Sequence, residues 1–259
     1  MNISRRVPLA LAVALIAAPA RPQFHKEEIE AAHKDSRRYY ALDETTVKIA
    51  KIGLIERPFK IKSPDSGGGR VPVLDEIVNI GEKIWEIIVD NKPIVDVETR
   101  YATALPRGST GWTQIAGWHV PAGPVYELTA RNGFGMEVIH VRYQILRAYG
   151  GSYQGKGKYL TAVAIEPLCV EVGWGYRFSM DATVPNTSVV NVGTPSDPVA
   201  GLMATLSWRV ATPIREFRGQ NLYFLQGDGV FREIGGPFSS RSLEKTKASV
   251  DRARGEALR

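Results

Sequence analysis

The sequence has only one cysteine in 259 residues, Cys169, so the chain can form no internal disulfide. A zinc site needs several cysteine or histidine ligands, and the four histidines are scattered along the chain. We therefore expect no metal site and no cofactor. The residues around Cys169 are mainly apolar, which favours a thiol that packs as a small hydrophobic group over a nucleophile.

Catalytic motifs are also missing. The sequence contains no Gly-x-Ser-x-Gly nucleophile turn and no His-Glu-x-x-His metal pair. Its glycine-rich stretch, residues 150–158, lacks the Gly-Lys-Ser/Thr ending of a phosphate loop and is typical of a β turn. The sequence therefore favours a protein that is not an enzyme. A hydrolase with an unrecognised site around His119 stays open as an alternative.

The chain has no large excess of one charge sign and no long apolar run after residue 20. The formal net charge is +6, and without Arg5 and Arg6 it is +4, because 31 basic residues then face 27 acidic ones. The two signs are mixed along the chain, so we expect no nucleic-acid partner. No stretch beyond residue 20 has the roughly 20 apolar residues of a membrane-spanning helix.

The first 20 residues have the three-part pattern of a secretory signal peptide. Arg5 and Arg6 make a short basic start, residues 7–18 are apolar or small with one proline, and Ala-Pro-Ala at residues 18–20 fits a signal-peptidase site. This apolar run is too short to cross a bilayer. We therefore expect a secreted protein, whether extracellular, at the cell surface or periplasmic.

Alternation of apolar and polar residues dominates the chain from residue 93 to residue 235. Val95 and Val97 alternate with Asp96 and Glu98, for example, which is the period of two of a strand with one wet face. Further runs, punctuated by Gly, Pro and Asn, occupy residues 125–130, 139–145, 158–165, 168–182, 199–212 and 220–233. About seven such strands predict a mainly β protein, an antiparallel β-sandwich or barrel-like domain over residues 71–235, preceded by helical segments.

An amphipathic helix is predicted over residues 72–90, at the start of this domain. Six apolar residues there follow the spacing of three and four that defines one helix face: Leu74, Ile77, Val78, Ile84, Trp85 and Ile88. This face either packs on one end of the sandwich or lies on a membrane surface. The acidic residues of the segment favour packing.

Charged segments flank the predicted domain. Residues 21–70 combine a charged, helix-prone part with a Ser/Pro/Gly-rich linker at residues 62–70. Residues 236–259 have few apolar positions and are typical of a solvated tail.

Aromatic residues gather beside the glycine-rich turns. Such residues next to Gly and Ser are common on surfaces that bind glycans or proteins, and the alternative is that they pack in and around the core. The candidate ligand-binding residues are Trp112, Trp118, His119, Tyr149, Tyr153 and Tyr159.

The order of a predicted amphipathic helix before an aromatic-rich β-sandwich resembles the layout of small sandwich-type cytolysins. The resemblance implies a membrane-active protein that uses residues 72–90, and it assigns no residue roles. The missing catalytic motifs favour instead a secreted, non-enzymatic module for binding, adhesion or extracellular assembly. We expect its partner to be a glycan, a protein or a second copy joined through an edge strand.

Overall fold

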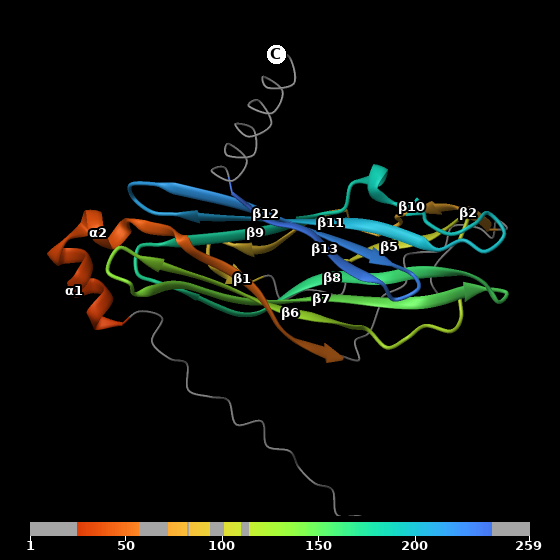
Figure 1. Cartoon of the computed structure of the whole chain (residues 1–259), viewed down its shortest axis with the longest axis horizontal. Coiled ribbons are helices and arrows are strands. Elements are labelled where there is room, and N and C mark those ends of the chain that lie inside the picture. Colours follow the sequence, from red (N-terminus) through yellow and green to blue (C-terminus); the bar gives the residue numbers. More distant parts are fainter. Residues whose placement is uncertain (1–24, 57–71, 82, 94–100, 110–113, 240–259) are drawn as a thin grey trace, which may run out of the picture.

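The computed structural model describes residues 25–56, 72–81, 83–93, 101–109 and 114–239 of the chain. The structure is mainly antiparallel β in two sheets that face each other, with helices α1 (Lys26–Lys34) and α2 (Ser36–Tyr40) at one end (Figure 1). The prediction of a mainly β, sandwich-type fold preceded by helical segments is confirmed. No helix among the described residues has both the length and the apolar character needed to cross a bilayer.

The first sheet has the strand order β1-β6-β7-β8-β5-β2, and all its neighbouring strands are antiparallel. Strands β7 and β8 have 17 residues each and form a hairpin that runs the length of the molecule (Figure 1). The strands of this sheet are β1 (Leu42–Glu56), β2 (Val73–Val78), β5 (Ala102–Arg107), β6 (Ala122–Asn132), β7 (Glu137–Tyr153) and β8 (Lys156–Val172).

The second sheet has the order β13-β12-β11-β9-β3-β4, with β10 paired to β11, and it is antiparallel throughout. A short 3-10 turn, η2 (Asn186–Ser188), precedes β10. The strands are β3 (Ile84–Val89), β4 (Lys92–Pro93), β9 (Arg177–Thr183), β10 (Val190–Asn191), β11 (Ala200–Ala211), β12 (Glu216–Gln226) and β13 (Phe231–Ser239).

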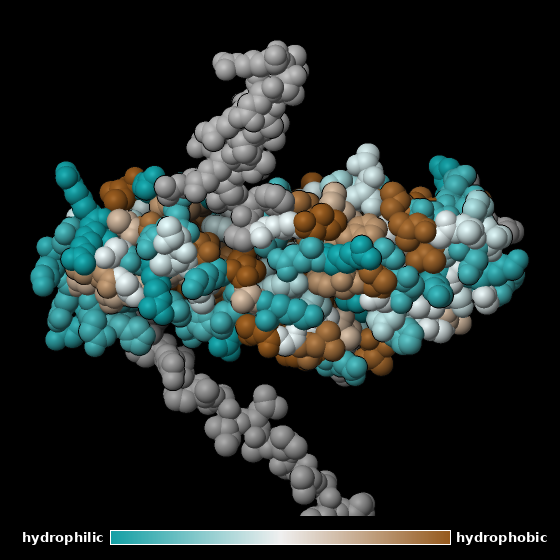
Figure 2. Space-filling model, in the orientation of Figure 1, coloured by the Kyte–Doolittle hydropathy of each residue, from teal (hydrophilic) through white to brown (hydrophobic). Residues whose placement is uncertain are grey.

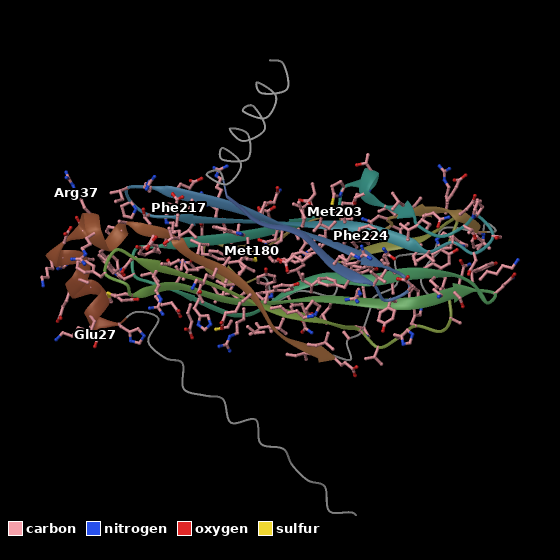
Figure 3. All side chains as sticks on the ribbon, in the orientation of Figure 1. Glu27, Arg37, Met180, Met203, Phe217 and Phe224 are labelled. Carbon is pink, nitrogen blue, oxygen red and sulfur yellow. The ribbon has the colours of Figure 1, made fainter. Side chains whose placement is uncertain are left out.

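The core lies between the two sheets because each long strand turns alternate side chains inward. Along β11, for example, Leu202, Ala204, Leu206, Trp208 and Val210 are buried, while the alternating residues Met203, Thr205, Ser207 and Arg209 are partly exposed. Met180 of β9 lies in this interior, whereas Glu27 and Arg37 project outward from the helices (Figure 3). The surface around the helices is mostly hydrophilic, and apolar patches appear along the middle of the molecule (Figure 2). Removal of the inward side chains from water is the main stabilising contribution.

Helices α1 and α2 pack on one end of the sandwich. Tyr39 is fully buried, and the Tyr176 hydroxyl donates a hydrogen bond to its carbonyl oxygen. A carboxylate oxygen of Glu28 accepts from the Trp174 amide at 3.3 Å, and Arg38 Nε donates to the Gly133 carbonyl oxygen at 3.0 Å. The helices are therefore attached to the turns that join β6 to β7 and β8 to β9.

The prediction of a helix over residues 72–90 is wrong. This segment forms β2 in the first sheet and β3 in the second. Burial alternates with period two over residues 84–87 of β3, where Trp85 and Ile87 are buried and Ile84 and Glu86 are exposed, and the alternation breaks at the register irregularity before Ile88. Valine and isoleucine are so frequent here that the apolar residues fit helix and strand spacing alike, and β-branched residues favour strands. Pairing of β3 with β9 then decides the conformation.

The N-terminal region, predicted as helix and linker, also contains the 15-residue strand β1. Only Val47 and Ile49 of its middle part pack against the core, so the apolar alternation is weak. The pairing of β1 with β6 nevertheless makes residues 42–56 part of the first sheet. Strand β13 likewise extends to Ser239, into the predicted tail. The predicted signal peptide, the linker at 62–70 and residues 240–259 lie outside the described residues.

Candidate binding site

The segment before β6 brings four of the predicted site residues together. It runs back along the end of β7, where Ala116 and Ser152 exchange two backbone hydrogen bonds of 3.0 and 2.8 Å. The His119 amide donates to the Tyr149 carbonyl oxygen at 2.9 Å. Trp118 and His119 therefore lie beside residues 149–153, which include Tyr149 and Tyr153, at the end of β7 remote from the helices (Figure 1).

Gly151 provides the space for the Trp118 indole. A Cβ atom at Gly151 would lie 2.5 Å from each of three indole carbons, Cζ2, Cη2 and Cζ3. These equal distances place the ring flat over the glycine backbone. Trp118 itself is half-buried, so its ring is held in place from one side and stays partly accessible to solvent.

His119 stacks on Tyr149. The ring centroids are 4.5 Å apart and the planes differ by 20°. Two glycines permit this close approach, since a Cβ at Gly150 would lie 2.6 Å from His119 Cδ2 and one at Gly229 would lie 2.7 Å from Tyr149 Cε2. Gly150 has a φ of +83°, which residues with a side chain rarely adopt. His119 is exposed and Tyr149 is half-buried, so the pair forms a small aromatic surface.

Arg147 lies under this surface and is 8 % exposed. Its guanidinium carbon is 5.5 Å from the ring centre of Tyr149 and 5.2 Å from that of Phe231. Nη2 donates to the Gly229 carbonyl oxygen at 2.8 Å, while Nε is enclosed and has no hydrogen-bond partner. Burial lowers the pKa of Arg147 below its usual range. Among the described residues no carboxylate forms an ion pair with it.

Ring contacts continue from this site into the core. Phe231 stacks with Tyr223 at 5.9 Å between ring centroids, and the Tyr223 hydroxyl is 2.7 Å from that of Tyr143. Burial raises the pKa values of both tyrosines well above the usual range, so both phenols stay neutral. The surface rings are thus supported by a rigid, buried aromatic cluster.

The remaining predicted aromatic residues are placed differently. Tyr159 is fully buried, and its hydroxyl donates to the Leu74 carbonyl oxygen at 2.9 Å. Burial raises the pKa of Tyr159 to about 12. Tyr159 is therefore a core residue, and Tyr153 is half-buried against the core. Trp112 lies outside the described residues.

The residues predicted to share one helix face do not share a face. Leu74, Ile77 and Val78 lie on β2 and are half-buried. Trp85 and Ile88 lie on β3 and are buried, whereas Ile84 of the same strand is 64 % exposed. The described residues of this segment therefore contain no amphipathic helix that could enter a membrane surface, and the resemblance in layout to sandwich-type cytolysins loses its basis.

A polar cluster on the outer face of the first sheet was not predicted. His140 Nε2 lies 2.8 Å from Glu127 Oε1, and His140 Nδ1 lies 3.4 Å from Glu171 Oε2. Arg142 Nε donates to the same Glu127 oxygen at 3.0 Å. These hydrogen bonds from His140 and Arg142 lower the pKa of Glu127. The cluster connects β6, β7 and β8, and the alternation around His140 was the sequence signal for it.

Cys169 pairs in register with Arg142 in this region and is half-buried. Burial is the main cause that raises the pKa of its thiol, and the nearby Glu171 carboxylate raises this pKa further. A raised pKa keeps the thiol protonated and weakens it as a nucleophile.

A shallow cavity of about 760 Å³ lies between the turns near the helical end, lined by Asp90, Asn91, Gly175, Tyr176, Arg177, Ala211, Thr212 and Pro213. The Asn91 side chain is already engaged, since Nδ2 donates to the Tyr176 carbonyl oxygen and Oδ1 accepts from the Phe178 amide. In the part of the chain that the structure describes, no three Asp, Glu, His or Cys side chains are grouped to bind a metal ion. Among these residues the His119 ring stacks on Tyr149, and no carboxylate or nucleophile forms a hydrogen bond with it.

Comparisons with known proteins add no family and no function. No protein family, curated protein or solved structure gives a significant match to the chain. The residues described above are therefore the basis for a functional proposal.

Proposed function

We propose that the chain is a non-enzymatic binding module that holds a glycan on the surface formed by Trp118, His119 and Tyr149, here called the aromatic end. One observation carries the proposal: the Trp118 ring lies flat on Gly151, and the next residue, His119, stacks on Tyr149 of the same strand, β7. Aromatic side chains fixed in this way have little freedom left to lose when a ligand binds, which favours affinity. Their faces suit ligands with both apolar and polar surface, and sugar rings are of this kind.

The other functions inferred from sequence receive less support. The membrane-active alternative depended on a helix at residues 72–90, where two strands occur. The hydrolase alternative depended on partners for His119, and its ring stacks on Tyr149 instead of meeting an acid or a nucleophile among the described residues. A binding surface needs neither feature.

Binding to a panel of neutral polysaccharides, such as cellulose, chitin and xylan, tests the proposal. We expect the protein, expressed from the full sequence and purified after export, to bind at least one of them, and Trp118→Ala to lose most of this binding. Trp174→Ala is the matched control, because Trp174 is also half-buried but lies at the helical end. The proposal fails if Trp118→Ala binds as well as the parent protein while both remain folded by circular dichroism.

Export is part of the proposed function and has a separate test. Residues 1–20 have the pattern of a signal peptide. We expect mass spectrometry of the protein from the medium or periplasm of a bacterial host to show an N-terminus at Arg21. An intact Met1 on protein retained in the cytoplasm would contradict export.

Self-association through β1 is a second candidate function. Strand β1 lies at the edge of the first sheet, and its Ile52, Leu54 and Ile55 side chains are 48, 64 and 39 % exposed. An apolar edge strand readily pairs with another chain. Light scattering should then give the mass of an oligomer for the parent and of one chain for Leu54→Lys. Ile234→Lys on β13, an edge strand of the second sheet, is the control and should leave the oligomer intact.

A further inference from the structure

Arg147 differs from the other arginines of known environment in the molecule. The arginines with ion-pair partners have side chains that are 40 to 74 % exposed, and they include Arg107 with Glu76 and Arg142 with Glu127. Arg147 is the most buried arginine described, at 8 % exposed, and it has no carboxylate partner among the described residues. Burial of a charge without a counter-ion lowers stability, so its presence at this place calls for a compensating interaction.

The contacts of Arg147 within the protein compensate only in part. Two rings, Tyr149 and Phe231, flank the guanidinium, and one nitrogen, Nη2, has a hydrogen bond. The enclosed Nε has none. A guanidinium has five N–H donors in a planar fork, so the Nη1 donors and the second Nη2 donor of Arg147 remain without a partner among the described residues.

The position of Arg147 connects it to the aromatic end. Tyr149 stacks with His119 at 4.5 Å on one side and lies 5.5 Å from the Arg147 guanidinium. A ligand whose ring lies on the aromatic end can therefore bring an attached group to the guanidinium. A carboxylate is the group whose two oxygens match the fork, and its pairing is strong where water is largely excluded.

We infer that the ligand of the aromatic end is an acidic glycan whose uronate carboxylate pairs with Arg147. The inference rests on the proposed glycan binding and adds the chemical class of the sugar. A uronic acid combines the two required parts, because its ring suits Trp118 and His119 and its carboxylate is attached directly to that ring.

Two polymers with the same ring and different charge test this inference. Affinity is measured for polygalacturonate and for its methyl ester at about 0.15 M salt, where exposed charges are largely screened. We expect the parent protein to bind the acid at least about tenfold more tightly than the ester. Arg147→Met should lose this preference. Arg232→Met removes an exposed arginine from β13 and should keep it.

The outcomes separate the inference from the proposed function. If the parent binds acid and ester equally, or binds only neutral polymers, and Trp118→Ala abolishes that binding, glycan binding stands and the uronate inference is wrong. If no glycan binds, both are wrong. Polyglutamate binding with the same dependence on Arg147 would identify an acidic peptide as the ligand and overturn the uronate assignment.

If Arg147→Met does not fold, a conservative variant still tests the inference. Arg147→Lys keeps the positive charge but cannot form the paired hydrogen bonds of the fork. Weaker binding of polygalacturonate with unchanged binding of the ester would support the inference. Unchanged binding of both polymers would overturn it.

Discussion

The phenol oxygens of Tyr143 and Tyr223 lie 2.7 Å apart and join β7 of the first sheet to β12 of the second. Both side chains are fully buried, so no water replaces either partner. This hydrogen bond therefore couples the two layers of the sandwich at the base of the aromatic cluster.

Replacement of only one of these tyrosines should destabilise the protein by more than half of the loss caused by replacing both. Tyr223→Phe leaves the Tyr143 hydroxyl buried without a partner, and we expect a loss of about 1–2 kcal/mol in the free energy of unfolding. The double variant should cost less than the sum of the single ones, because it leaves no unpaired group. Urea denaturation measures all three. Strict additivity would show that the two hydroxyls are not coupled.

Alkaline pH should unfold the protein and ionise its buried tyrosines together. Burial raises the pKa of Tyr159 to about 12, from about 10 in an unfolded chain. The folded state thus keeps its proton where the unfolded state has released it. The stabilising contribution is complete below pH of about 10 and is lost as the pH rises through the folded value. Phenolate absorbance and far-ultraviolet circular dichroism should change in one step, and ionisation before unfolding would contradict this.

Acid should weaken the His140 cluster through Glu127. Hydrogen bonds from His140 and then Arg142 lower the Glu127 pKa, so its contribution is present above the unfolded value of about 4.3 and is lost as the pH falls through the lower folded value. Because the Glu127 side chain is 29 % exposed, we expect Glu127→Gln to cost only about 0.5 kcal/mol near neutral pH. Thermal unfolding from pH 7 downward measures it. Glu137→Gln, 3.9 Å from His140, is the control and should have a smaller effect.

Gly151→Ala should disturb the aromatic end without unfolding the protein. The new Cβ would lie 2.5 Å from the Trp118 indole, which must move away. We expect a changed tryptophan fluorescence spectrum, weaker glycan binding and a stability loss of about 1–3 kcal/mol. Gly53→Ala is the matched control, because no atom lies within 4 Å of its Cβ position. Equal effects of the two substitutions would contradict the proposed role of Gly151.

The parts of the fold that followed from the sequence are those with clear period-two alternation. Val141, Tyr143 and Ile145 are buried in β7, and His140 and Arg142 lie on its polar face. At residues 72–90 the alternation did not identify the strands, because the frequent apolar residues fit the spacing of a helix and that of a strand equally well. Only pairing with β5 and β9, both distant in the sequence, selects the strand.

The candidate site could be predicted in composition but not in arrangement. Trp118, His119 and Tyr149 were identified from their glycine neighbours, but their meeting depends on backbone hydrogen bonds to residues 149–152 that leave no local pattern. Arg147 was missed because a lone arginine resembles an ordinary surface residue. The sequence did contain a signal that Arg147 is not an ordinary surface residue. Ile145, Arg147 and Tyr149 occupy alternate positions and therefore lie on one face of β7.

The 17-residue length of β7 and β8 sets a distance scale for the whole molecule. At roughly 3.3 Å per residue, each strand spans about 55 Å. The described N-terminal helices lie at one end of this hairpin, and the aromatic end lies near the other (Figure 1). A chain attached to a surface through its N-terminal side would therefore present the proposed ligand site several nanometres away from that surface.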